Sequence, residues 1–206
     1  MRETSSRYRQ AMRPHVTIYF IRHGETEWNA EARYQGQADI PMNERGRAQA
    51  KRNGQSLVPL LPEIAKADYV ASPLARARET MRIVRGALGL TPDDFRTDDR
   101  LKEAHYGDWQ GTLAADLPRV DAQGMEARTR DPFRWRPQGG ESYEDLMARA
   151  VPWFEGVGRD TVVVSHGGVS RVLRGHILGL DLKSVPLLDV PQDRVLVLRH
   201  DAIDWL

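Results

Sequence analysis

A chain of 206 residues is long enough to bury the core of one domain, and its formal net charge of +1 gives no overall field that would attract nucleic acid or an anionic membrane. It contains no cysteine, which excludes thiol catalysis, disulfide bonds and cysteine-ligated metal sites. No apolar run approaches the ~20 residues needed to span a bilayer, so a cytoplasmic protein without a membrane partner is predicted.

The first fourteen residues are predicted to form a flexible N-terminal tail. They are rich in arginine and serine but have no apolar stretch of the kind found in secretory signals. The alternative is that Met12 is the natural start and that residues 1–11 do not belong to the protein. We expect one domain over residues 15–206.

Strands and helices alternate from there onward. Val16–Ile21 and Ala67–Ser72 are short apolar runs, typical of strands buried on both faces. A helix is expected after each of them. The first can be capped by the side chain of Asn43, and the second opens at Pro73 and stops at Gly89.

The same alternation continues in the second half. A brief strand is expected near Arg96–Leu101, and a capping box of Ser142 and Asp145 predicts a helix over Ser142–Val157. Thr161–Ser165 gives the clearest strand pattern, and the helix that follows it should end at Gly179.

The alternation predicts an α/β fold, in which a mostly parallel central sheet carries helices on both faces as a three-layer sandwich. Arg194–His200 reads as the last strand, and as a sheet edge it could pair in a homodimer. Thr112–Gly140 is the one long segment without clear periodicity, and we interpret it as a short cap inserted into the domain (about 112–140).

Five chemically active side chains follow the predicted strands at their carboxyl ends. Arg22 and His23 follow the first strand, and Arg76 comes one helical turn after the second. Glu103 follows the third strand and His166 the fourth. Because ligands of such sheets bind outside the carboxyl ends of the strands, we expect these five residues to meet at one rim.

These residue types suit phosphoryl transfer. Guanidinium groups hold a phosphate dianion bidentately, and a neutral imidazole can attack phosphorus and become phosphorylated. A second, protonated histidine could stabilise the charge on the phosphoryl oxygens, and a carboxylic acid could protonate the leaving alkoxide. The helix that opens at Gly167 adds backbone N–H groups aimed at an anion.

Each of these residues also has an ordinary structural explanation when it is taken alone. A histidine after a strand is more often a hydrogen-bonded core residue than a catalyst. Arg22 could pair with Glu25 or Glu27 in a loop, and Arg76 with Glu79 on a helix surface. Their joint placement at strand ends is what favours an anion site.

The motifs that carry these residues resemble, in order, those of the histidine phosphatase superfamily, the phosphoglycerate mutase-like proteins. The signature is "FIRHGET" (Phe20–Thr26), and "ASPLARARET" (Ala71–Thr80) bears the arginine. "LKEAHYGDWQG" (Leu101–Gly111) matches the acid motif, and "VVVSHGG" (Val162–Gly168) matches the motif of the second histidine. The resemblance extends over nearly the whole chain from Val16.

The resemblance implies a metal-independent phosphomonoesterase without a cofactor, in which arginines supply the charge that Mg²⁺ provides elsewhere. His23 would be the phosphorylated nucleophile and Glu103 the general acid, and the phosphate pocket would be formed by Arg22, Arg76 and His166. It also implies five residues that bind the substrate, a small-molecule phosphate ester: Asn29, Gln35, Gly36, Tyr106 and Gly167.

Three departures from the cofactor-dependent mutases of the superfamily favour its phosphatase branch. The segment after the acid motif is shorter, Ala114 stands where the mutases carry a lysine, and "HGGVSRVL" (His166–Leu173) is more similar to the phosphatases. Phosphoglycerate mutase is the alternative, because the insertion carries arginines that could hold a second anionic group: Arg119, Arg128, Arg130, Arg134 and Arg136. Nearby carboxylates nearly offset them, so the ordinary alternative is a mixed-charge surface helix: Asp116, Asp121, Glu126 and Asp131.

The aromatic residues Trp109, Phe133 and Trp135 allow two interpretations. They could form an apolar cap over a bulky substrate, as would suit a nucleoside phosphate in the α-ribazole phosphatases of the superfamily, or they could pin the insertion to the core. A minor alternative is an inactive binding module. Superfamily members of that kind should lack one of the five active groups, and all five are present here.

Overall fold

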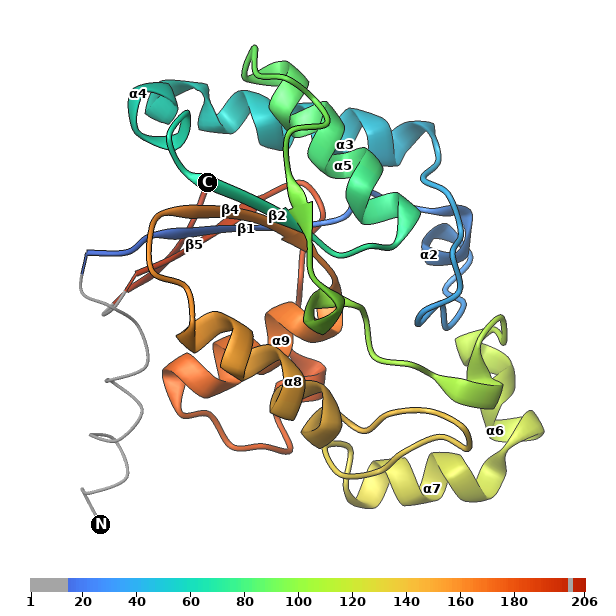
Figure 1. Cartoon of the computed structure of the whole chain (residues 1–206). Coiled ribbons are helices and arrows are strands. Elements are labelled where there is room, and N and C mark those ends of the chain that lie inside the picture. Colours follow the sequence, from blue (N-terminus) through green and yellow to red (C-terminus); the bar gives the residue numbers. More distant parts are fainter. Residues whose placement is uncertain (1–14, 200–201) are drawn as a thin grey trace.

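The computed structural model describes residues 15–199 and 202–206 (Figure 1). The predicted tail over residues 1–14 lies outside this range, and so does His200 at the end of the last predicted strand. In the described part of the chain, a six-stranded sheet in the order β3-β2-β4-β1-β5-β6 lies between helices on both of its faces. The predicted α/β fold is confirmed.

Four neighbouring strands of this sheet run parallel, namely β1 (Ile18–Arg22), β2 (Asp68–Ala71), β3 (Arg96–Thr97) and β4 (Thr161–Ser165). Strand β4 lies between β1 and β2, and all five of its residues are buried. A strand covered on both faces has no solvent side, which is why its sequence is a continuous run of apolar residues.

The other two strands make the sheet mixed. β5 (Val195–Leu198) runs antiparallel to β1, and β6 (Ile203–Trp205) runs antiparallel to β5. The prediction of a sheet edge at Arg194–His200 is therefore wrong, because β6 covers that side. Strand β6 has only three residues, and its half-exposed pattern carries too little hydrophobic signal to predict a strand.

Two pairs of helices cover the sheet (Figure 1). α3 (Glu44–Leu57) packs beside α5 (Ala75–Ala87) on one face, and α8 (Tyr143–Glu155) packs beside α9 (Gly167–Leu178) on the other. Successive side chains of β4 supply both cores, since Val162 and Val164 join one apolar cluster and Val163 joins the other. The remaining short helices are α2 (Glu27–Ala30), α4 (Leu61–Ile64), and the single 3₁₀ turns η1 (Val58–Leu60), η2 (Asp99–Leu101), η3 (Gly107–Trp109), η4 (Ala114–Asp116) and η5 (Val185–Leu187).

The predicted helix ends are confirmed at three positions. Asn43 Oδ1 accepts a hydrogen bond of 2.8 Å from Gly46 N at the start of α3. Ser142 and Asp145 form the reciprocal capping box of α8. Gly179 ends α9 with φ of +59°, a left-handed conformation that favours glycine.

The segment over residues 112–140 contains two further helices, α6 (Leu117–Val120) and α7 (Ala122–Arg130), which lie beyond α2 at the edge of the molecule (Figure 1). No residue of α7 is buried, and a helix without an apolar face shows no helical periodicity in its sequence. Within the described residues, we find no helix that is both long enough and apolar enough to cross a lipid bilayer.

Candidate active site

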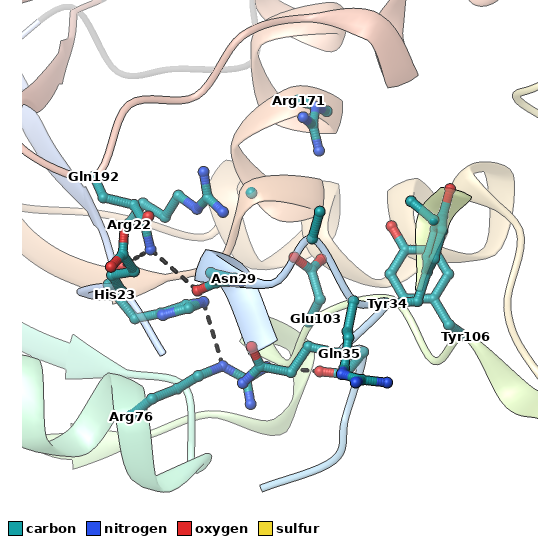
Figure 2. Close-up of a pocket in the computed structure, with 16 residues that line it drawn as sticks. Arg22, His23, Asn29, Tyr34, Gln35, Arg76, Glu103, Tyr106, Arg171 and Gln192 are labelled. Carbon is teal, nitrogen blue, oxygen red and sulfur yellow. Dashed lines mark hydrogen bonds between the residues drawn. The ribbon is translucent and has the colours of Figure 1, made fainter. Parts of the chain in front are cut away.

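A cavity of about 400 Å³ opens at the carboxyl ends of the parallel strands (Figure 2). Nine of the ten predicted site residues line it: Arg22, His23, Asn29, Gln35, Gly36, Arg76, Glu103, Tyr106 and Gly167. The tenth, His166, is fully buried, and its ring centroid lies 5.0 Å from that of His23. The predicted convergence at one rim is confirmed.

His23 stands at the centre of the site, with 3% of its surface exposed. Its Nδ1 lies 2.8 Å from the carbonyl oxygen of Gly24, and because a carbonyl can only accept, Nδ1 carries the proton. The other ring nitrogen, Nε2, then has the lone pair and accepts from Arg76 Nε at 3.3 Å. Burial, together with the cations Arg76 and Arg22, holds the His23 pKa well below its usual 6.5, so the imidazole is neutral at neutral pH.

Arg76 is fixed by all three of its nitrogen groups. Besides Nε, its Nη1 donates to the carbonyl of Ala38 at 2.7 Å and its Nη2 to that of Gly36 at 2.6 Å. The Gln35 amide is oriented with its oxygen 2.9 Å from Arg76 Nη1. Burial lowers the Arg76 pKa to about 10, which still leaves the guanidinium charged at neutral pH.

Gly36, whose carbonyl accepts from Arg76 Nη2, packs too tightly against the loop of Tyr106 and Gln110 to carry a side chain. Its φ is +56°, and a Cβ atom there would lie 2.4 Å from Gln110 Oε1 and 2.9 Å from Tyr106 N. The glycine therefore allows a backbone carbonyl to hold the arginine fork.

Arg22 ends β1 and donates through Nη1 to the carbonyl of Val190 at 2.6 Å, while its buried Nε has no partner. Burial lowers the Arg22 pKa. Beside it, Gln192 donates through Nε2 to the His23 carbonyl at 3.0 Å and to Asn29 Oδ1 at 3.3 Å. Asn29 is thus held with its amide at the pocket.

His166 occupies the N-cap position of α9, where its Nε2 lies 2.7 Å from Ser72 Oγ and its buried Nδ1 has no partner. Burial, and then the charges of Arg76 and the neighbouring His23, hold the His166 pKa well below 6.5. His166 is therefore neutral in this structure, in contrast to the predicted protonated histidine. A phosphate dianion beside it would favour the charged form.

Glu103 faces the pocket from the loop after β3 (Figure 2). Both of its carboxylate oxygens accept from Gly168 N at 3.1 Å, in the first turn of α9. A Cβ atom on Gly168 would lie 2.3 Å from Glu103 Oε1, so only glycine permits this contact. Arg149 on α8 holds this loop in place, because its Nη2 donates to the Glu103 carbonyl at 2.9 Å.

Several residues that line the pocket were not predicted, and the sequence marks them as pocket residues to different degrees. Arg171 follows Gly167 by four residues on α9, a helical spacing from which its place in the pocket could have been inferred. Tyr34 packs edge-on against Tyr106, with ring centroids 4.9 Å apart. Gln192 lies in a loop far from any motif, and no local signal marks it.

Trp109, Phe133 and Trp135 anchor the insertion. Trp109 is 3% exposed, donates through Nε1 to Asp121 Oδ2 at 2.8 Å, and lies against Trp135 with ring centroids 4.2 Å apart. Phe133 is 2% exposed and belongs to the main core. The interpretation that these rings pin the insertion to the core is the correct one.

The arginines of the insertion fit a mixed-charge surface. Four of them form ion pairs with carboxylates: Arg119, Arg130, Arg134 and Arg136. The fifth, Arg128, contacts Tyr34 in the pocket wall instead. In the described residues we find no group of three or more histidine, aspartate or glutamate side chains that could hold a metal ion.

Comparison with known proteins agrees with this geometry. The family "Histidine phosphatase superfamily (branch 1)" matches residues 18–206. The glucosyl-3-phosphoglycerate phosphatase of Mycolicibacterium vanbaalenii is 34% identical over 83% of this chain and 78% of its own length. A 2,3-bisphosphoglycerate-dependent phosphoglycerate mutase of Gloeobacter violaceus is 28% identical over 90% of this chain and 86% of its own.

A solved structure of mycobacterial glucosyl-3-phosphoglycerate phosphatase, described as complexes with VO3, matches with a TM-score of 0.74 at 31% identity over 93% of this chain and 96% of its own. The prediction of a phosphomonoesterase related to phosphoglycerate mutase and acting on small phosphorylated metabolites is confirmed at the level of enzyme class. From its motifs, its fold and these similarities, the chain belongs to the histidine phosphatase superfamily.

Proposed function

We propose that His23 is the nucleophile of this phosphatase and is phosphorylated on Nε2 during turnover. The tautomer is the observation that carries the proposal: the proton on Nδ1 is held by the Gly24 carbonyl, which leaves the lone pair on Nε2, where it accepts from Arg76 Nε in the free protein. A bound phosphoryl group would take over this donor and so release the lone pair for attack. Because the pKa of His23 is held well below 6.5, by burial first and then by Arg76 and Arg22, the attacking form is present at neutral pH.

The phosphoryl group would lie between two guanidinium groups and the start of α9. Arg22 and Arg76 come from opposite sides of His23, and neither has a carboxylate within 4 Å in the described part of the chain. The amide of Asn29 and the backbone N–H of Gly167 would complete the pocket. Phosphoryl transfer depends mainly on such positioning and charge stabilisation.

Glu103 would move the protons. In the first step, Nε2 of His23 forms a bond to phosphorus while the ester P–O bond breaks, and the carboxylic acid of Glu103 gives its proton to the departing alkoxide. In the second step, the carboxylate takes a proton from a water molecule whose oxygen attacks phosphorus. The P–N bond then breaks, and inorganic phosphate and free His23 are released with Glu103 reprotonated.

Two observations support hydrolysis over mutase chemistry. Ala114, which stands where the mutases of the superfamily carry a lysine, lines the pocket and offers no ammonium group. The ion-paired arginines of the insertion do not line the pocket either.

We propose that residues 112–140 form a cap inserted into one domain. The inactive-module alternative loses support because all five active groups meet at one site, and a cytoplasmic location stays a prediction.

The test is a chemical quench of the enzyme with a phosphomonoester, in the presence of EDTA. We expect an acid-labile, base-stable phosphoenzyme together with one inorganic phosphate per alcohol released. His23→Ala should abolish the phosphoenzyme and lower kcat/KM by about 10⁴-fold or more. His15→Ala, at an exposed position outside the pocket, is the matched control. Turnover that survives in His23→Ala would show that another group is the nucleophile.

A further inference from the structure

The pocket carries more positive charge than a phosphate ester needs. Four arginines and two glutamates line it. Arg33 is engaged with Glu31 and with the Gly111 carbonyl, and Glu25 accepts from Asn43. In the described part of the chain, Arg22, Arg76 and Arg171 have no carboxylate within 4 Å of their guanidinium nitrogens. The arginine–carboxylate ion pairs found there are formed by other arginines.

Arg171 is the third of these cations, and neutral acceptors hold it in place. Its Nε donates to the Leu188 carbonyl at 2.7 Å, and its Nη1 donates to Tyr143 Oη at 3.3 Å. Burial alone would lower the Arg171 pKa, but the neighbouring Tyr143, Tyr106 and Glu103 raise it above the usual value. The guanidinium is therefore charged and preorganised.

Arg171 lies beside the proposed phosphate pocket rather than in its centre. A methyl group built on Gly167 would lie 3.5 Å from Arg171 Nη1 and 3.6 Å from Arg22 Nε, so these two cations flank one glycine. Figure 2 shows Arg171 and Arg76 on opposite sides of the pocket, with Glu103 between them. A group next to Arg171 would thus stand on the same side of the phosphate as the leaving-group acid.

Charge balance leaves Arg171 without a partner when a simple ester binds. The two charges of a phosphate dianion match Arg22 and Arg76, and Glu103 is neutral while it acts as the acid. Arg171 donates its hydrogen bonds only to neutral acceptors, and the nearby charge of Glu103 is lost while that residue carries the proton it gives to the leaving group. A half-buried cation in that position has lost hydration without gaining an ion pair. A substrate with one more negative charge on its leaving group would supply that pair.

We propose that Arg171 binds a carboxylate on the alcohol portion of the substrate, so that the preferred substrates are phosphate esters of small hydroxy acids. This inference rests on the proposed function, because it places the carboxylate relative to a phosphate at His23. One guanidinium fork matches one carboxylate in charge and in bidentate geometry. Arg171 is then a specificity-determining residue of the phosphatase.

A matched pair of substrates tests the proposal. D-3-Phosphoglycerate and D-glycerol 3-phosphate have the same configuration at C2 and differ only at C1, which is a carboxylate in the first and a hydroxymethyl group in the second. We expect the wild type to prefer 3-phosphoglycerate by about tenfold or more in kcat/KM. Arg171→Gln should reduce this ratio to about one, and Arg171→Lys should retain part of it.

Arg174 provides the matched control on the same helix. Its Nη1 donates to the Asp189 carbonyl at 2.6 Å, much as Arg171 donates to Leu188, but Arg174 does not line the pocket. Arg174→Gln should keep the wild-type ratio. A wild-type ratio near one, or an undiminished ratio in Arg171→Gln, would overturn the proposal whatever the stability of the variant.

Failure of the proposed function gives a different result. If neither ester is hydrolysed and no phosphoenzyme forms, the phosphohistidine mechanism is wrong, and the preference is then measured from binding. 3-Phosphoglycerate should still raise the Tm of the wild type more than glycerol 3-phosphate does, and this difference should disappear in Arg171→Gln. Equal shifts in the wild type would contradict the carboxylate site itself.

Discussion

The arginines of the pocket and those of the insertion lie in opposite environments. Arg76 is 1% exposed and is surrounded by carbonyl groups and a histidine. Arg134 has 57% of its side chain exposed and pairs with both Asp131 and Glu144. The amino acid is the same, and its local density in the sequence is higher in the insertion.

The difference between the two regions is the partner of each charge. A surface ion pair is satisfied within the protein and has no need of a ligand. A buried guanidinium whose hydrogen bonds go only to neutral acceptors has no ion pair in the free protein, and an anionic ligand supplies one. The absence of a carboxylate partner, more than the number of arginines, therefore distinguishes the buried arginines of the pocket from the surface arginines of the insertion.

The largest expected effect comes from the pocket side. Arg76→Lys keeps the charge but cannot form the three-way contact to His23, Gly36 and Ala38. We expect kcat/KM to fall by about 10³-fold, with the loss mainly in kcat. Arg78→Lys, at an exposed position on the same helix, is the control and should stay within twofold of the wild type. Equal activity of both variants would remove the distinction between the two kinds of arginine.

Much of the pocket side could be predicted from the sequence because three of the four strands that lead to active residues are clear apolar runs, namely β1, β2 and β4. Glu103 is the exception, since the β3 strand before it has only two residues and both are exposed. His23 comes after Phe20 and Ile21, and His166 comes after the valines of β4. Strand ends fix the place of a residue in a parallel sheet, so the convergence followed from topology.

The remaining features depend on contacts that local patterns do not encode. Gln192 reaches the site through a long loop, and α7 has no buried face that could set a helical period. The pairing of the insertion's arginines depends on Glu144 and Asp145, which lie beyond the insertion in the chain. The neutral state of His166 depends on its burial behind His23, which spacing cannot reveal.

The pH dependence of stability gives the next largest effect. Burial and nearby cations lower the pKa values of His23 and His166 in the folded state, whereas the unfolded chain titrates near 6.5. Below about pH 6.5 the unfolded state thus binds more protons, so the free energy of unfolding falls as the pH falls, by up to about 1.4 kcal/mol per pH unit for each histidine.

Urea unfolding between pH 5 and pH 8 measures this slope. His166→Gln should reduce the slope of the free energy of unfolding against pH by the equivalent of about one proton below pH 6.5. Above that pH, the curves of the variant and the wild type should run parallel. Arg136→Gln, which removes an ion pair of the insertion, should keep the wild-type slope. If His166→Gln were to run parallel to the wild type over the whole range, His166 would not be neutral in the folded protein.

A smaller effect is expected from Arg128, which connects the two regions. Its Nη1 donates to Tyr34 Oη, and its guanidinium lies 5.5 Å from the Tyr34 ring centroid and 5.8 Å from that of Trp109. Arg128→Gln should loosen the pocket wall and raise KM by about three- to tenfold, with kcat within twofold. Arg130→Gln on the same helix, which loses only a pair with Glu126, should leave KM unchanged. A fall in kcat without a change in KM would place Arg128 in the chemical step instead.

The smallest effect is expected at Arg136, although its ion pair has good geometry. Its Nη2 lies 2.8 Å and 2.6 Å from the two carboxylate oxygens of Asp145, but 58% of the side chain is exposed. Asp145 is also held by the N–H and hydroxyl of Ser142, so the cap of α8 survives in Arg136→Gln. We expect kcat/KM within twofold of the wild type and a loss in the free energy of unfolding below about 1 kcal/mol, smaller still in about 0.5 M salt. Ser142→Ala removes the cap itself and should cost at least as much, about 1 kcal/mol. A tenfold loss of kcat/KM in Arg136→Gln would mean that a paired surface arginine serves the site, and pairing would then fail to separate the two regions.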